Sequence, residues 1–229
     1  MSDAVNPTRI TVDVVSDVVC PWCYIGQKRL EKGIAWQTGL EVDLRWRPYQ
    51  LDPTIPPEGV DRRQYMLAKF GSEQKLREIH DRIAPLGAAE GIDFHFGDIE
   101  RSPNTLDAHR VIRWAAANGE VVQHSVVRAL FSAFFEHGQD ISDHAVLTRI
   151  AGENGMDEAV VASLLATDAD AAEVSAEIDQ ARRMGVTGVP CFLLEGRYAV
   201  VGAQDAEVLA DAIRQVAEAK RAGKLDAPA

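Results

Sequence analysis

A Cys-x-x-Cys pair lies where the sequence pattern changes, and it constrains the fold more than any other feature. Cys20 and Cys23 stand in "VVCPWCYIGQKRL", directly after a strand-like run and at the start of a helix-like one. Such a pair can hold a metal ion, form a structural disulfide or act as a redox couple. The rest of the sequence has to distinguish these three roles.

The segments around the cysteine pair have the order strand, helix, strand. "RITVDVVSD" alternates β-branched and polar residues, and "LEVDLRWRPYQL" alternates again. Between them, "CYIGQKRLEKGIAWQTG" has apolar residues at near-helical spacing and a glycine where a helix can end. These segments predict a βαβ unit with the cysteine pair at the amino end of its helix.

The remaining sequence is first helical and then β-like. Residues 61–184 consist mainly of helix-like segments, several of which end in glycine, with one short strand expected at "DFHFGD". After Gly185, "VPCFLLEG" and "RYAVVGA" predict an antiparallel hairpin, and a helix capped by Asp205 follows. The aromatic residues expected in the core are Trp46, Trp114, Phe131, Phe134 and Phe135.

This pattern predicts two domains, one of which is discontinuous. Residues 1–60 and 185–229 are expected to form a single mixed α/β sheet with flanking helices, and residues 61–184 an inserted helical domain. The proline-rich stretch "QLDPTIPPEGVD" marks the point where the chain leaves the first unit.

The composition excludes several classes of function. Of the 229 residues, 46% are hydrophobic and 26% are charged, which is ordinary for a globular protein. No apolar run approaches the roughly 20 residues of a membrane helix, and the net charge of −11 opposes non-specific binding to nucleic acid or anionic membranes. "MSDAVNPTRI" has no basic region followed by an apolar one, so we expect no secretory signal and a cytoplasmic location.

The cysteine count and the histidine spacing favour a redox couple. Three cysteines are too few for a disulfide-stapled scaffold. The third, Cys191, is far from the pair, and no H-x3-5-H motif lies near it, which disfavours a metal site. The free N–H groups at a helix start favour the thiolate of Cys20, and the spacing places Cys23 one turn along on the same side, where it can resolve a mixed disulfide.

Four motifs, "SDVVCPWCYIG", "RSPNTLDAHR", "GVTGVPCFLL" and "VVGAQ", occur in an order that resembles the DsbA-like thioredoxin-fold proteins of the FrnE type. These proteins are known as dithiol–disulfide isomerases of polyketide biosynthesis. The resemblance covers nearly the whole chain and implies a thioredoxin fold (βαβ…ββα) with a large helical insertion. It also implies a thiol–disulfide oxidoreductase or isomerase, without metal or cofactor, that acts on disulfides of proteins or small molecules.

The same resemblance assigns roles to individual residues. Cys20 is the nucleophile, Cys23 is the resolving thiol, and Val189–Pro190 form a cis-proline loop that faces them. The other residues expected to contact substrate are Pro21, Trp22, Val189, Pro190, Asn104, Thr105 and His109.

Four residues also have simpler interpretations. From the residues alone, "SPNTLDAHR" can be a helix that is capped by Ser102 and carries an exposed His109. Asp17 lies three residues before Cys20, and we expect it to be a solvated loop aspartate. The alternative is that Asp17 acts as a proton acceptor or tunes the ionisation of the cysteine pair. Cys191 stands where the family more often has threonine; we expect a buried, inert thiol, and the alternative is a third redox sulfur.

Two other functions stay open at this point. A related branch, which resembles the 2-hydroxychromene-2-carboxylate isomerases and the kappa-class glutathione transferases, has serine where Cys20 stands and binds glutathione there. A glutathione-dependent isomerase or transferase is therefore the alternative enzyme, with glutathione as co-substrate. A non-enzymatic holdase or partner-binding site is the third reading. Disulfide-containing substrates are the expected partners, nucleic acid and membranes are not, and a homodimer is one option for the oligomeric state.

Overall fold

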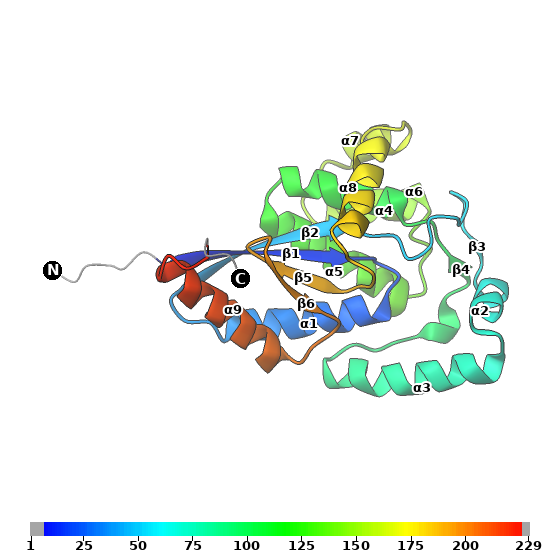
Figure 1. The fold of residues 1–229 in the computed structure, drawn as a ribbon. Coiled ribbons are helices and arrows are strands. Elements are labelled where there is room, and N and C mark those ends of the chain that lie inside the picture. Colours follow the sequence, from blue (N-terminus) through cyan, green and yellow to red (C-terminus); the bar gives the residue numbers. More distant parts are fainter. Residues whose placement is uncertain (1–6, 226–229) are drawn as a thin grey trace.

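A four-stranded sheet with the order β2-β1-β5-β6 forms the centre of the protein (Figure 1). The structure, a computed structural model, describes residues 7–225. β1 (Thr8–Ser16) and β2 (Leu40–Pro48) are parallel, whereas β5 (Cys191–Leu194) runs antiparallel to both β1 and β6 (Tyr198–Val201). The sheet therefore takes two strands from each of two segments that are far apart in the sequence.

Helices cover both faces of this sheet. α1 (Pro21–Ala35) and α9 (Ala206–Arg221) pack against each other on one side (Figure 1). On the other side α4 (Leu106–Ala117), α5 (Glu120–Phe135) and α8 (Ala171–Arg183) contact β2. The observed order is the predicted βαβ, helical insertion and ββα.

The segment between β2 and β5 contains the other helices and a small second sheet. The further helices are α2 (Arg62–Phe70), α3 (Glu73–Ala89), α6 (His144–Glu153) and α7 (Glu158–Leu165). β3 (Val60–Asp61) and β4 (Arg101–Ser102) form an antiparallel pair. α2 and α3 lie at the side of the molecule opposite α9 (Figure 1), and α2 has no fully buried residue.

Aromatic side chains join α1 to α5 in the core. The Tyr24 ring stacks on Phe131 with 5.0 Å between the ring centroids, and Phe131, Phe134 and Phe135 are completely buried. The predicted core position of these phenylalanines, and of Trp46 and Trp114, is confirmed. This packing fixes the helix that carries the cysteine pair to the helical segment as well as to the sheet.

Two local predictions differ from the structure. Instead of a strand at "DFHFGD", residues Phe96–Asp98 form a single 3₁₀ turn, because the Asp98 N–H donates back to the His95 carbonyl and the His95 N–H donates to the end of α5 at Phe135, so neither pairs with a strand. The two-residue strands β3 and β4 are too short to give an alternating pattern. The division at residues 60/61 and 184/185 stays a prediction, and its outer ends at residues 1 and 229 lie outside the described residues.

Within the described part of the chain, none of the helices has the length and hydropathy needed to span a bilayer. The first residues of "MSDAVNPTRI", on which the expectation about a secretory signal rests, lie outside that part.

Candidate active site

Cys20 occupies the N-cap of α1, as predicted. Its backbone is extended (φ −94°, ψ 112°), and its carbonyl oxygen accepts hydrogen bonds from the N–H groups of Cys23 (3.0 Å) and Tyr24 (3.3 Å). Pro21 is the first helical residue, where the missing N–H costs nothing. Cys20 therefore stands at the positive end of the α1 helix dipole, which attracts negative charge.

The cis-proline loop lies against this cysteine. The Val189–Pro190 peptide bond is cis, and the Cys20 thiol donates to the Val189 carbonyl oxygen with 3.7 Å between sulfur and oxygen. Both parts of the prediction, the cis bond and the loop facing the pair, are confirmed. Close approach is possible because Gly26 has no side chain: a Cβ there would lie 2.9 Å from Pro190 Cγ.

The two cysteines of the pair have different environments. Both are buried, Cys20 at 4% and Cys23 at 1% exposed, but Cys20 lines the adjacent cavity and Cys23 is not among the described residues that line it. Burial, together with the neighbouring Cys20, raises the pKa of the Cys23 thiol well above its ordinary value. Both cysteines are free thiols. The arrangement thus provides one thiol that a substrate can reach and one that stays protonated behind it.

Cys191 is buried away from the pair, as expected. It is 2% exposed and packs in a small apolar cluster with Val15, Tyr49, Ala181 and Val186. Burial raises the pKa of its thiol, which lowers its reactivity at neutral pH.

Asp17 and His109 are buried side by side, so the expectations of a solvated Asp17 and an exposed His109 are wrong. The Asp17 carboxylate accepts from the Leu51 N–H at 2.8 Å, and its other oxygen has no hydrogen bond among the described residues. His109 Nε2 lies 3.4 Å from that oxygen and donates to the Tyr49 carbonyl at 2.8 Å. The chain that follows β2 covers both side chains. A role for Asp17 as proton acceptor stays a prediction.

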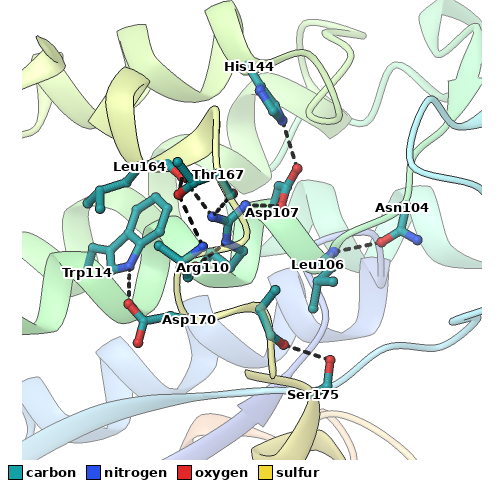
Figure 2. A network of polar contacts seen from close by, with 12 residues as sticks. Asn104, Leu106, Asp107, Arg110, Trp114, His144, Leu164, Thr167, Asp170 and Ser175 are labelled. Carbon is teal, nitrogen blue, oxygen red and sulfur yellow. Dashed lines mark hydrogen bonds and ion pairs between the residues drawn. The ribbon is translucent and has the colours of Figure 1, made fainter. Parts of the chain in front are cut away.

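Asn104 is a structural residue at the start of α4. Its side-chain oxygen accepts from the Leu106 N–H at 2.9 Å (Figure 2). Its amide donates to the Ile55 carbonyl at 2.6 Å. The predicted Ser102 cap is wrong, because Ser102 belongs to β4 and α4 begins at Leu106. Asn104 thus ties the loop after β2 to the helix, while the next residue, Thr105, reaches the cavity.

The arginine of the same motif also has a structural role. Arg110 is 3% exposed and donates to the carbonyl oxygens of Leu164, Thr167 and Ala169, and to the Asp107 carboxylate (Figure 2). These bonds hold the turn between α7 and α8 against α4. The motif "SPNTLDAHR" therefore mainly organises the wall behind the site.

A cavity of about 470 Å³ lies beside Cys20. Five of the predicted site residues line it: Cys20, Pro21, Trp22, Thr105 and Val189. Four others are not among the described residues that line it: Cys23, Pro190, Asn104 and His109. Its size is typical of a small-molecule site.

The opposite wall of this cavity comes from α2 and α3, which were not predicted to belong to the site. The residues that they contribute are Arg62, Tyr65, Met66, Lys69, Phe70, Ile79, His80, Arg82 and Ile83. The one available signal is in α2, whose apolar residues Tyr65, Met66 and Phe70 are half-buried although the helix has no fully buried residue. Within the described residues, no group of three or more His, Cys, Asp or Glu side chains could hold a metal ion.

Comparison with known proteins agrees with this geometry. Residues 11–214 match the family model of the DsbA-like thioredoxin domain. The chain is 27% identical over 208 residues to the uncharacterised protein YwbO of Bacillus subtilis, which covers 89% of this chain and 96% of YwbO.

Two solved structures extend the comparison. A probable DsbA oxidoreductase from Streptomyces coelicolor is 32% identical, with a TM-score of 0.83 over 93% of this chain and 91% of that one. A 2-hydroxychromene-2-carboxylate isomerase shares the fold at 18% identity, with a TM-score of 0.70 over 93% and 98%. The predicted thioredoxin fold with a helical insertion is confirmed, and the chain belongs to the DsbA-like thioredoxin domain family.

Proposed function

We propose that the chain is a thiol–disulfide oxidoreductase or isomerase that acts through Cys20 and Cys23 on disulfides of proteins or small molecules. One observation carries the proposal. The Cys20 sulfur stands at a helix N-terminus, lines a cavity and contacts the Val189 carbonyl at 3.7 Å, with Cys23 buried one turn along. The FrnE type and the cytoplasmic location rest on the sequence and stay predictions.

The chemistry takes place in two displacements. The Cys20 thiolate attacks one sulfur of a substrate disulfide, the substrate S–S bond breaks, and the released thiolate takes a proton from solvent. Cys23 then gives its proton to solvent and attacks the Cys20 sulfur of the mixed disulfide; the bond between Cys20 and the substrate sulfur breaks, and the departing second thiolate takes a proton from solvent. Two electrons pass to the substrate, so a dithiol or monothiol reductant has to restore the pair. Isomerisation needs only the first displacement and its reversal, without net electron transfer.

The different environments of the two thiols support this order of events. The raised pKa of Cys23 keeps its thiol protonated in the resting protein, so that Cys20 attacks first. Once a mixed disulfide has formed, the Cys20 charge, which contributes to that raised pKa, has disappeared. Resolution is thereby favoured after substrate has bound and disfavoured before.

Reduction of insulin by dithiothreitol tests the proposal. We expect the wild type to accelerate the reaction, Cys20→Ser to abolish the acceleration, and Cys23→Ser to accumulate mixed disulfides that mass spectrometry detects. Cys191→Ala is the matched control, since it removes a thiol outside the site. An active Cys20→Ser, or a Cys23→Ser variant that releases substrate normally, would overturn the assignment.

The glutathione-dependent isomerase or transferase is supported by fold likeness alone, and a cysteine at position 20 is what distinguishes this chain from that branch. Conjugation of glutathione to a chromogenic electrophile tests it separately. Activity there, combined with no insulin reduction, would favour this second function over the first.

A further inference from the structure

Arg62 is a half-buried cation in the wall of the cavity beside Cys20. It lies in the first turn of α2, and its guanidinium carbon is 5.5 Å from the centroid of the fully buried Phe134 ring. Burial lowers the pKa of Arg62 to about 10, which leaves it charged at neutral pH. Within residues 7–225 its guanidinium has no ion pair and donates no hydrogen bond. Burying a charged guanidinium without a partner costs free energy. An anionic ligand bound to Arg62 would offset that cost.

The acidic groups of the same wall are already occupied. Asp52 accepts hydrogen bonds from the N–H of Thr54 (3.0 Å) and from the Tyr65 hydroxyl (3.0 Å), and Lys69 donates to that same hydroxyl at 3.0 Å. The next residue, Arg63, is exposed and paired with Glu73. Arg62 therefore differs from Arg63 and Asp52 in lining the cavity with no carboxylate or hydroxyl partner among the described residues.

The charge on the two sides of the cavity sets the orientation of an anion. Asp17 lines the Cys20 side, whereas the cations Arg62 and Lys69 on α2 and Arg82 on α3 line the opposite wall. A carboxylate is repelled near Asp17 and attracted at Arg62. A bound molecule with one anionic group would thus place that group against α2, and the remainder of the molecule would extend toward the Cys20 sulfur.

The surface between these two ends is mainly apolar. Trp22, Leu51, Met66, Phe70 and Ile79 line the cavity, whose volume of about 470 Å³ holds a molecule of one or two aromatic rings. Such a lining stabilises a bound aromatic or aliphatic group by burying its apolar surface, and it contributes little binding free energy to a hydrophilic peptide.

We propose that this cavity takes a small disulfide with an apolar body and a carboxylate, and that Arg62 binds the carboxylate while Cys20 attacks the sulfur. The inference rests on the proposed redox function of Cys20 and specifies its substrate class. The electron balance is that of the two displacements described above, with one molecule of disulfide reduced to two thiols for each Cys20–Cys23 disulfide formed.

Two chromogenic aromatic disulfides test the role of Arg62. One, dithiobis(nitrobenzoate), has a carboxylate on each ring; the other, dithiodipyridine, is neutral. In stopped-flow measurements on the reduced protein, we expect Arg62→Gln to lower the rate with the anionic disulfide by about tenfold or more, because a charge-assisted contact is lost. The rate with the neutral disulfide should stay within about twofold. Arg62→Lys should recover part of the loss.

Arg63→Gln is the matched control. It removes the same charge from the adjacent position of the same helix, but its side chain is exposed and does not line the cavity. Both disulfides should react with it as with the wild type. An Arg63→Gln variant as slow as Arg62→Gln would show that net charge alone is responsible and would overturn the inference.

A competition measurement on the wild type covers the case in which Arg62→Gln fails to fold, which circular dichroism would reveal. Naphthoate should protect Cys20 from the neutral disulfide at concentrations about tenfold lower than the alcohol naphthylmethanol, which has the same apolar body. Equal protection by the two compounds would overturn the role of Arg62.

The two proposals fail in different ways. If wild-type Cys20 reacts with neither disulfide and insulin is not reduced, the redox function itself is wrong. If the neutral disulfide reacts and insulin is reduced, while Arg62→Gln slows both aromatic disulfides equally or neither of them, the redox function stands and the carboxylate site is wrong.

Discussion

Replacing Gly26 by alanine should displace the cis-proline loop from Cys20. Gly26 lies in the second turn of α1, and an added Cβ would lie 2.9 Å from Pro190 Cγ and 3.2 Å from Phe192 Cζ. Carbon atoms in ordinary contact are about 3.5–4.0 Å apart, so the loop or the helix has to move by roughly 0.5–1 Å. The Val189 carbonyl, 3.7 Å from the Cys20 sulfur, moves with the loop.

The effect on stability follows from two opposing terms. Overpacking of a filled contact costs about 1–3 kcal/mol, and replacing a helical glycine by alanine returns about 1 kcal/mol. The free energy of unfolding should therefore fall by roughly 0–2 kcal/mol, which for a chain of this size lowers the Tm by about 2–4 °C per kcal/mol. The effect on activity should be larger, because a misplacement of about 1 Å at a reacting centre costs up to roughly a hundredfold in rate. We expect insulin reduction to fall by about tenfold.

Gly33→Ala is the control for this prediction. A Cβ at Gly33 would lie 2.9 Å from the Ala206 carbonyl oxygen and 3.2 Å from the Ala210 nitrogen, so the overlap and the gain in helix propensity are similar. The displaced element is α9, which does not line the cavity. Thermal unfolding and insulin reduction should show comparable losses of stability in the two variants and a loss of activity in Gly26→Ala alone. Equal activity in both would refute the reasoning.

Three further predictions concern the surroundings of the site. Cys191→Ala should keep insulin reduction within about twofold and cost less than about 2 kcal/mol, because a single buried sulfur is lost. A Cys191 disulfide to the pair, seen by mass spectrometry after air oxidation, would contradict this. Arg110→Met should lower the free energy of urea unfolding by about 3–5 kcal/mol, since the buried guanidinium's ion pair with Asp107 and its bonds to three partly buried carbonyl groups are lost; a loss below 1 kcal/mol would be inconsistent with the network. Burial alone would raise the pKa of Glu90, but Lys32 and Arg29 outweigh it and lower the pKa overall. The stability that the ionised Glu90 contributes is fully present above its pKa in the unfolded chain, about 4.3, and is lost as the pH falls through its lower pKa in the folded protein. The urea midpoints of wild type and Glu90→Gln should therefore differ at pH 7 and converge under acid conditions.

The sequence predicts the parts of the site that depend on local chemistry. Alternation of apolar residues identified β1, and the change to helical spacing placed Cys20 at a helix start, where Pro21 fits the first turn. The glycine-flanked turn before an apolar strand, together with the resemblance to the DsbA-like proteins, identified the Val189–Pro190 loop. Each of these patterns is contained in a short stretch of the sequence.

Burial imposed by distant segments could not be predicted in the same way. Asp17 and His109 are polar residues at positions where local sequence favours solvent, and only the path of the chain after β2 covers them. The position of Arg62 depends on how α2 packs against α3 and the β3–β4 pair, and the periodicity of α2 does not specify these partners. Local patterns therefore located the reacting sulfurs and left the shape of the binding surface undetermined.

The strand order has a consequence for synthesis on the ribosome. β1 is an inner strand, yet its second neighbour, β5, is encoded about 175 residues later. At about 5–20 residues per second, roughly 10–35 s separate the appearance of the two strands. During that interval the nascent chain has an open strand edge next to two unprotected thiols, a combination prone to intermolecular pairing. Early packing of Tyr24 on Phe131 would shorten the time for which the thiols and the strand edge are exposed, because the first βαβ unit can then pack on α5 before β5 and β6 have been synthesised.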